Sequence, residues 1–152
     1  MQIGGIGQVP PSWSVVGTAD FNGDRNGDIL WRESGGDMAI WLMNGLQVEQ
    51  SVVLGQVAAA LSQREISTAT ARGDVLWRDN NGNLAIWFMN GLQISTIGSL
   101  DMVPNNWLIA ETGDFDGDGK RDILWRDTTS GAVAIWFMNG TQITQSAGLG
   151  II

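Results

Sequence analysis

The chain has 152 residues and a formal net charge of −8, from 16 acidic and 8 basic side chains. It contains no Cys and no His, which excludes disulfides, Cys/His zinc sites and mechanisms that need imidazole or a thiolate. The acidity argues against nucleic acid or an anionic membrane surface as a partner. The length suits one domain, and no apolar stretch is long enough for membrane insertion.

The first eight residues do not read as a secretory signal. Met1 to Gln8 lack a basic start and a long apolar run. Their pattern is close to that of the last strand of a later repeat, such as Ile97-Gly98-Ser99-Leu100. We therefore expect residues 1–8 to form a spare outer strand of a neighbouring repeat.

The rest of the chain repeats one unit three times, as in repeat architectures built from stacked units. Two phrases recur, Ile29-Leu30-Trp31-Arg32 and Ala39 to Gly45. Both are apolar at successive positions, as in strands buried on both faces. The second phrase ends in Asn-Gly, a strong hairpin signal. The first phrase returns at 75–78 and 123–126, and the second at 85–91 and 134–140.

A unit of this kind predicts an all-β fold. Four short strands in about 40–50 residues is the size of a propeller blade, and each blade of a propeller is covered by a neighbour on both faces. We predict a β-propeller built of four-stranded antiparallel blades, with three blades in a single repeat array over residues 1–152. The predicted blades are residues 9–55, 56–101 and 102–152.

The first unit contains an acidic loop from Asp20 to Asp28. Asn22 and Asp24 lie between these two residues, so side-chain oxygens recur at alternating positions, as Ca²⁺ requires. Arg25 stands at the sixth position, where glycine is usual, and this costs strain if the position needs a positive φ. We expect this loop to bind calcium more weakly than its counterpart in the third unit.

The second unit departs from its neighbours. Its corresponding stretch runs from Ile66 to Asp74 and keeps only the last carboxylate. We predict that this degenerate loop binds no calcium.

The third unit carries the most acidic loop, residues 114–122. It begins like an EF-hand loop, D-x-D-x-D-G, but Trp125 stands where an EF-hand needs a bidentate Glu, and the flanking residues read as strands. A calcium loop inside a β-hairpin is one interpretation, and an acidic solvated turn without metal is the other. The second copy at residues 20–28 favours the metal. The four carboxylates are Asp114, Asp116, Asp118 and Asp122.

The sequence Asp-Phe-Asp-Gly-Asp-Gly-Lys at 114–120, with the Leu-Trp-Arg and Ala-Ile-Trp-Phe-Met-Asn-Gly phrases that follow it, is similar to the FG-GAP/VCBS repeat. This repeat is the calcium-loop blade of integrin-type β-propellers, here in its bacterial form, and the resemblance covers residues 9–150. It implies bound Ca²⁺ and a secreted or cell-surface protein. The implied ligands are Asp114, Asp116, Asp118, Asp122 and the Lys120 carbonyl in the third unit, and Asp20, Asn22, Asp24, Asp28 and the Asn26 carbonyl in the first.

Three blades cannot close a propeller, because four is the usual minimum. An open stack exposes an apolar face at each end, and such faces aggregate unless they are covered. Either the chain is a piece of a longer propeller, or it associates. We expect a homo-oligomer, most simply a dimer that gives six blades.

The expected function is a non-catalytic calcium-binding module for assembly or surface recognition of a protein or carbohydrate. A catalytic metal needs an acid, base or nucleophile beside it, and the chain has no His, Cys or Tyr and a single lysine, so we do not expect an enzyme. The alternative is a calcium-stabilised lectin in which Trp13 and Trp107 stack on sugar rings. A polysaccharide-active enzyme domain is the third reading. The six repeated tryptophans are expected in the core.

Each unit also has an arginine followed by an acid at the end of its first repeated phrase. A repeated arginine at one strand position indicates a structural ion pair or a cap on backbone carbonyls, with an anion site as the alternative. The pairs are Arg32 with Glu33, Arg78 with Asp79, and Arg126 with Asp127.

Overall fold

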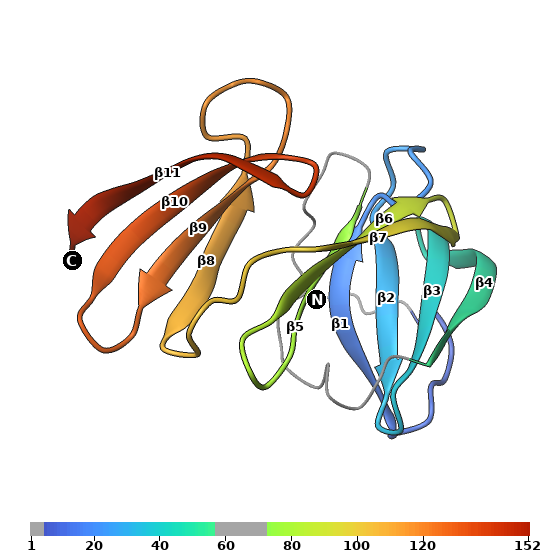
Figure 1. The fold of residues 1–152 in the computed structure, drawn as a ribbon. Coiled ribbons are helices and arrows are strands. Elements are labelled where there is room, and N and C mark those ends of the chain that lie inside the picture. The colour runs from blue at the N-terminus through green and yellow to red at the C-terminus, as the bar shows by residue number, and fades with distance from the viewer. Residues whose placement is uncertain (1–4, 57–72) are drawn as a thin grey trace.

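The computed structural model describes residues 5–56 and 73–152, and every regular element in them is a β-strand. The strands form three antiparallel sheets, which lie side by side in chain order and have 4, 3 and 4 strands (Figure 1). The first unit has β1 (Trp13–Ala19), β2 (Asp28–Glu33), β3 (Asp37–Asn44) and β4 (Gln47–Gln56); the second has β5 (Val75–Arg78), β6 (Leu84–Asn90) and β7 (Gln93–Ser99); the third has β8 (Trp107–Gly113), β9 (Asp122–Asp127), β10 (Ala132–Asn139) and β11 (Gln142–Ile151).

The all-β prediction is confirmed, and the four-stranded unit is confirmed for the first and third repeats. In the second unit the described residues form three strands, which correspond to the second, third and fourth strands of the other units. The expected first strand falls within residues 57–72, outside the described residues. Most of the degenerate loop lies there too. The spare strand expected at 1–8 is only partly described, and residues 5–8 carry no strand.

The three units are copies in backbone register as well as in sequence. Within each sheet, consecutive strands pair with one another. Trp31 lies opposite Ala39, and the equivalent Trp77 and Trp125 also lie opposite alanines. The third strand of each unit has a register shift just before the methionine that the three units share. The Asn-Gly turn that follows it has its glycine at φ of 60–62° in all three units, as a tight hairpin requires.

The hydrophobic core lies between the sheets, in two clusters. One cluster joins the first and second units, and contains Leu30 and Trp77. The other joins the second and third units, and contains Leu76 and Trp125. The repeated tryptophans also pair within each sheet, with ring centroids 4.9–5.1 Å apart. The prediction that they belong to the core is confirmed for Trp77, Trp87 and Trp125, and Trp136 packs against the second cluster. It is wrong for Trp31 and Trp41, which belong to neither cluster and are half-buried.

The arginine at the end of β5 caps backbone carbonyls. Arg78 is 5% exposed, and its guanidinium donates to the carbonyls of Val103 (2.7 Å) and Pro104 (2.6 Å) and to that of Trp107. These carbonyls belong to the segment that enters the third unit. A positive charge buried among carbonyl oxygens fits the capping interpretation of the repeated arginines.

The acids that follow the arginines cap their own turns. Asp127 accepts hydrogen bonds from the Thr129 N–H at 2.7 Å and from the Asn106 side chain at 3.0 Å. These contacts, the Thr129 N–H foremost, lower the pKa of Asp127 to about 2. The Asn83 side chain similarly lowers the pKa of Asp79, and the Ser34 hydroxyl that of Glu33.

The segment between the second and third units crosses a turn of the second unit at very close range. The Val103 N–H donates to the Gly82 carbonyl at 2.9 Å. Gly82 has a φ of 89°, and a Cβ at this position would lie 2.1 Å from the Val103 carbonyl oxygen. Only glycine allows this approach without displacing backbone.

We predict that Gly82→Ala separates the second unit from the third and lowers the free energy of unfolding by about 2–5 kcal/mol, from left-handed strain and backbone overlap together. Gly91→Ala is the matched control, because Gly91 has a φ of 60° with nothing within 4 Å of the added methyl. It should cost about 1–2 kcal/mol. Denaturant unfolding measures both. Equal losses would show that the close approach to Val103 contributes nothing.

Candidate metal centre

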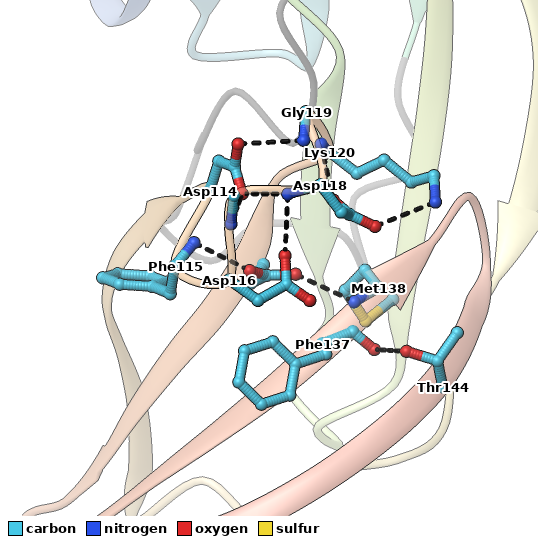
Figure 2. A network of polar contacts seen from close by, with 11 residues as sticks. Asp114, Phe115, Asp116, Asp118, Gly119, Lys120, Phe137, Met138 and Thr144 are labelled. Atoms are coloured by element: carbon cyan, nitrogen blue, oxygen red, sulfur yellow. Dashed lines mark hydrogen bonds and ion pairs between the residues drawn. The ribbon is translucent and has the colours of Figure 1, made fainter.

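The acidic loop of the third unit is organised by its first carboxylate. Asp114 Oδ1 accepts hydrogen bonds from the backbone N–H groups of Gly117 (2.6 Å) and Asp118 (3.0 Å), and Oδ2 accepts one from Gly119 (2.9 Å). Figure 2 shows the loop folded round this side chain. Gly117 and Gly119 both have positive φ, so the chain can turn tightly enough to present these N–H groups.

The last carboxylate joins the loop to the sheet. Asp122 is 1% exposed; its Oδ2 accepts the Phe115 N–H at 2.9 Å and its Oδ1 accepts the Met138 N–H on β10 at 3.0 Å. The two hydrogen bonds connect the start of the loop to the third strand of the unit. A movement of the Asp122 side chain would therefore change its hydrogen bond to β10.

The hydrogen bond to the third strand exists in all three units. Asp28 accepts the Met43 N–H at 2.9 Å, and Asp74 accepts the Met89 N–H at 2.8 Å. Burial raises the pKa of Asp28, against the effect of its hydrogen bonds. Asp74 remains although the rest of its loop sequence has changed, so this position has a structural role that needs no metal. For the equivalent Asp28 and Asp122 the sequence pattern predicted a role in metal binding only.

Three carboxylates gather at the third loop. One oxygen each from Asp114, Asp116 and Asp122 lies within 4.8 Å of the others. Among the described residues, this is where three acidic groups come together. Three negative charges at this distance repel one another unless a cation lies among them. The oxygen-only donor set is the kind that hard divalent cations take.

The fourth expected ligand faces away from this group in the structure. Asp118 Oδ2 forms an ion pair with Lys120 Nζ at 2.9 Å, and Oδ1 accepts the Lys120 N–H at 2.8 Å (Figure 2). The Lys120 contacts lower the pKa of Asp118, and the same pair raises the pKa of Lys120. The ion pair is exposed on both sides, so its energy is small and its geometry adjustable. Recruitment of Asp118 to a cation would require that pair to open.

The first loop has the same backbone arrangement as the third, but it lacks a cluster of three carboxylates among its described residues. Asp20 accepts three backbone N–H groups at 2.6–3.0 Å, as Asp114 does. Asn22 replaces the middle carboxylate, and its side chain donates to Asp24 at 2.9 Å. This hydrogen bond lowers the pKa of Asp24. Asp24 also accepts the N–H of Asn26 at 2.7 Å. In the first loop the Asn22 amide donates a hydrogen bond to a carboxylate, whereas in the third loop the equivalent Asp116 adds a third negative charge to the cluster.

The donor set of the third loop fits a hard divalent cation. Asp114, Asp116 and Asp122 would hold it, because a carboxylate has about four lone-pair sites and can accept N–H groups and a cation together. Such a cation would neutralise the local charge and draw the loop onto β10 through Asp122. These three residues are among the ligands that the motif predicted. The other two predicted ligands in this loop are Asp118, which is paired with Lys120, and the Lys120 carbonyl.

The two tryptophans expected to stack on sugars occupy unlike environments. The Trp107 carbonyl accepts a hydrogen bond from Arg78, and its ring is half-buried against the cluster between the second and third units. Trp13 lines a pocket of about 230 Å³ on the first unit, together with Trp31 and Trp41. The structure therefore places Trp107 in a contact between units and Trp13 at an open surface.

No protein-family model matches the chain, and neither a curated protein nor a solved structure matches it. The likeness to FG-GAP/VCBS repeats is therefore carried by its motif residues. A search of the described part of the chain finds no helix with the length and apolar character needed to cross a membrane.

Arg25 has a φ of 73°, the only positive value at a described non-glycine residue. The strain anticipated from the sequence is therefore present. We predict that Arg25→Gly raises the free energy of unfolding by about 1 kcal/mol by removing left-handed strain. The reciprocal Gly119→Arg, at a φ of 81°, should lower it by a similar amount. Thermal unfolding of both variants in EDTA measures this, and a stability loss in Arg25→Gly would contradict it.

Proposed function

We propose that this protein is a non-catalytic, calcium-binding β-propeller-type module that acts in assembly or surface recognition. The observation that carries the proposal is the group formed by Asp114, Asp116 and Asp122, three carboxylates within 4.8 Å of one another. The loop pattern, its near copy at residues 20–28 and the resemblance to FG-GAP/VCBS repeats support Ca²⁺ as the ion. The same resemblance supports a secreted or cell-surface location.

The cation's role in this proposal is structural. Asp122 is hydrogen-bonded to β10, so a cation bound by Asp122 and Asp114 would join the loop to the sheet. A ligand that binds only the folded state stabilises it by linkage. Catalysis would need an acid, base or nucleophile beside the metal. The chain has no His, Cys or Tyr, and its single lysine, Lys120, is paired with Asp118.

A lectin remains the second candidate, and the pocket beside Trp13 is the observation that favours it. Trp13, Trp31 and Trp41 line that pocket, and aromatic rings are suitable platforms for the apolar faces of sugars. Trp107, the equivalent of Trp13, instead contributes to the contact between two units. Because Trp107 lies in a contact between two units, we favour a role in assembly over sugar binding for this tryptophan position.

We predict that Ca²⁺ raises the melting temperature of the protein. We also predict that the effect of Asp116→Asn on stability depends on whether Ca²⁺ is present. In EDTA the variant should be at least as stable as the parent, because it removes one of three clustered negative charges. In millimolar Ca²⁺ the parent should be the more stable, because the variant loses an ionic ligand.

Thermal unfolding by circular dichroism in EDTA, Ca²⁺ and Mg²⁺ measures this. The matched control is Asp101→Asn, which removes the same charge at an exposed position outside the loops and should melt like the parent in every buffer. A parent protein whose melting temperature ignores Ca²⁺ would refute the metal role.

A further inference from the structure

The contact between the second and third units joins two unlike faces. We call the side of a sheet that meets the next unit its forward face, and the side that meets the preceding unit its rear face. Arg78 extends from the forward face of the second unit to the carbonyls of Val103, Pro104 and Trp107. Its guanidinium carbon lies 5.9 Å from the ring centroid of Trp125, on the rear face of the third unit.

The contact between the first and second units repeats this arrangement. The guanidinium carbon of Arg32, on the forward face of the first unit, lies 6.0 Å from the ring centroid of Trp77. Leu30 beside it is fully buried, and Trp77 is 2% exposed. Arginine over tryptophan, with leucine packed beside them, is thus the general contact between consecutive units.

The third unit carries an uncovered copy of the forward face. Leu124 is half-buried, whereas the equivalent Leu30 and Leu76 are 0% exposed. Arg126 is exposed, whereas the equivalent Arg78 is 5% exposed. This face therefore holds the arginine and the leucine of the contact without the tryptophan and the carbonyls that receive them.

The first unit carries an uncovered copy of the rear face. Trp31 is half-buried, whereas the equivalent Trp77 and Trp125 are 2% and 1% exposed. A pocket opens on this face beside Trp31. The residues lining it include Val9, Pro10, Trp13 and Trp31.

The pocket is built from the first-unit equivalents of the residues that receive Arg78. The run Val9-Pro10-Pro11-Ser12-Trp13 corresponds to Val103-Pro104-Asn105-Asn106-Trp107. The Trp13 N–H donates to the Pro10 carbonyl at 3.0 Å, and the Trp107 N–H donates to the Pro104 carbonyl at 3.0 Å. The receiving turn therefore exists before any arginine enters it, which lowers the cost of binding.

We propose that the forward face of the third unit binds the rear face of the first unit in a second copy of this chain, with Arg126 in the pocket at Val9, Pro10 and Trp13. Two copies related by a two-fold axis make this contact twice and form a closed ring of six units. The occupant follows from the chain itself, which carries both halves of a contact that it makes internally. The inference rests on the proposed assembly function and names the contact that performs it.

Ile152 must move for this contact to form. Ile152 lies beyond β11, and its N–H donates to the Gly131 carbonyl at 3.1 Å, as the Val103 N–H donates to the Gly82 carbonyl at 2.9 Å. In the ring, Val9 of the second copy takes the place of Ile152. Ile152 is 84% exposed, so the exchange replaces one backbone hydrogen bond by an equivalent one and uncovers little apolar surface.

Sedimentation velocity in Ca²⁺ tests the contact. The parent should sediment as a dimer of the 16.4 kDa chain. Arg126→Ala should raise the dimer dissociation constant roughly 100- to 1000-fold, because each dimer loses two buried arginine contacts. Arg25→Gly is the matched control. It changes the net charge by the same amount at another exposed arginine and should leave the dimer intact.

A complementation experiment tests which faces meet. Val53 is 65% exposed and lines the pocket, so Val53→Arg should exclude Arg126 of a second copy without entering the core. Arg126→Ala and Val53→Arg should each be monomeric alone. Mixed, they should form a heterodimer, because the intact pocket of one receives the intact arginine of the other.

The outcomes separate this contact from the proposed function. A parent dimer unaffected by Arg126→Ala, or variants that fail to complement, would overturn the contact and leave assembly standing. A monomeric parent over the whole concentration range would overturn self-association. The Ca²⁺-dependent melting shift, measured on the same samples, should persist in monomeric Arg126→Ala. Its absence in every sample would refute the metal role independently of the ring.

Discussion

Each sheet of this protein is apolar on both faces, and this constraint determines how the units are arranged. A sheet of three or four strands cannot bury both faces by itself, so it requires a neighbour on each side. Within the chain, the second unit satisfies this on both sides, through the clusters that contain Trp77 and Trp125. In the contact between the second and third units, Arg78 donates hydrogen bonds to the backbone carbonyls of the segment that enters the third unit.

The acidic loops are coupled to the sheets by one buried aspartate per unit. Asp28, Asp74 and Asp122 each accept an N–H from the third strand of their unit. In the third unit the same residue also belongs to the group of three carboxylates. A cation there would therefore act on the sheet directly, whereas the second unit keeps the hydrogen bond without the acidic loop. Metal binding is, on this account, an addition to a structural connection that all units share.

The sequence predicted the features that repeat locally and missed those that depend on distant segments. Hydrophobic pattern and Asn-Gly turns were sufficient for the strands, and the glycine position of the loop predicted the positive φ of Arg25. The carbonyl partners of Arg78 come from 25–29 residues away, so pattern alone left ion pair, cap and anion site open. Asp118 was predicted to be a ligand from its spacing, but its ion pair with Lys120 depends on side-chain conformation. Val9-Pro10 matches Val103-Pro104 in the sequence, but the role of this match follows only from the hydrogen bonds that Arg78 donates to the Val103 and Pro104 carbonyls.

If the two uncovered faces of the stack cover one another in a closed ring, the mass of the particle is fixed. Small-angle X-ray scattering of the parent protein in Ca²⁺, over a wide concentration range, measures that mass. A closed ring should give a constant mass of twice 16.4 kDa and a distance distribution with the single broad maximum of a compact particle. A mass that rises steadily with concentration would show that the faces join without closing. A mass of one chain at every concentration would contradict the closed ring altogether.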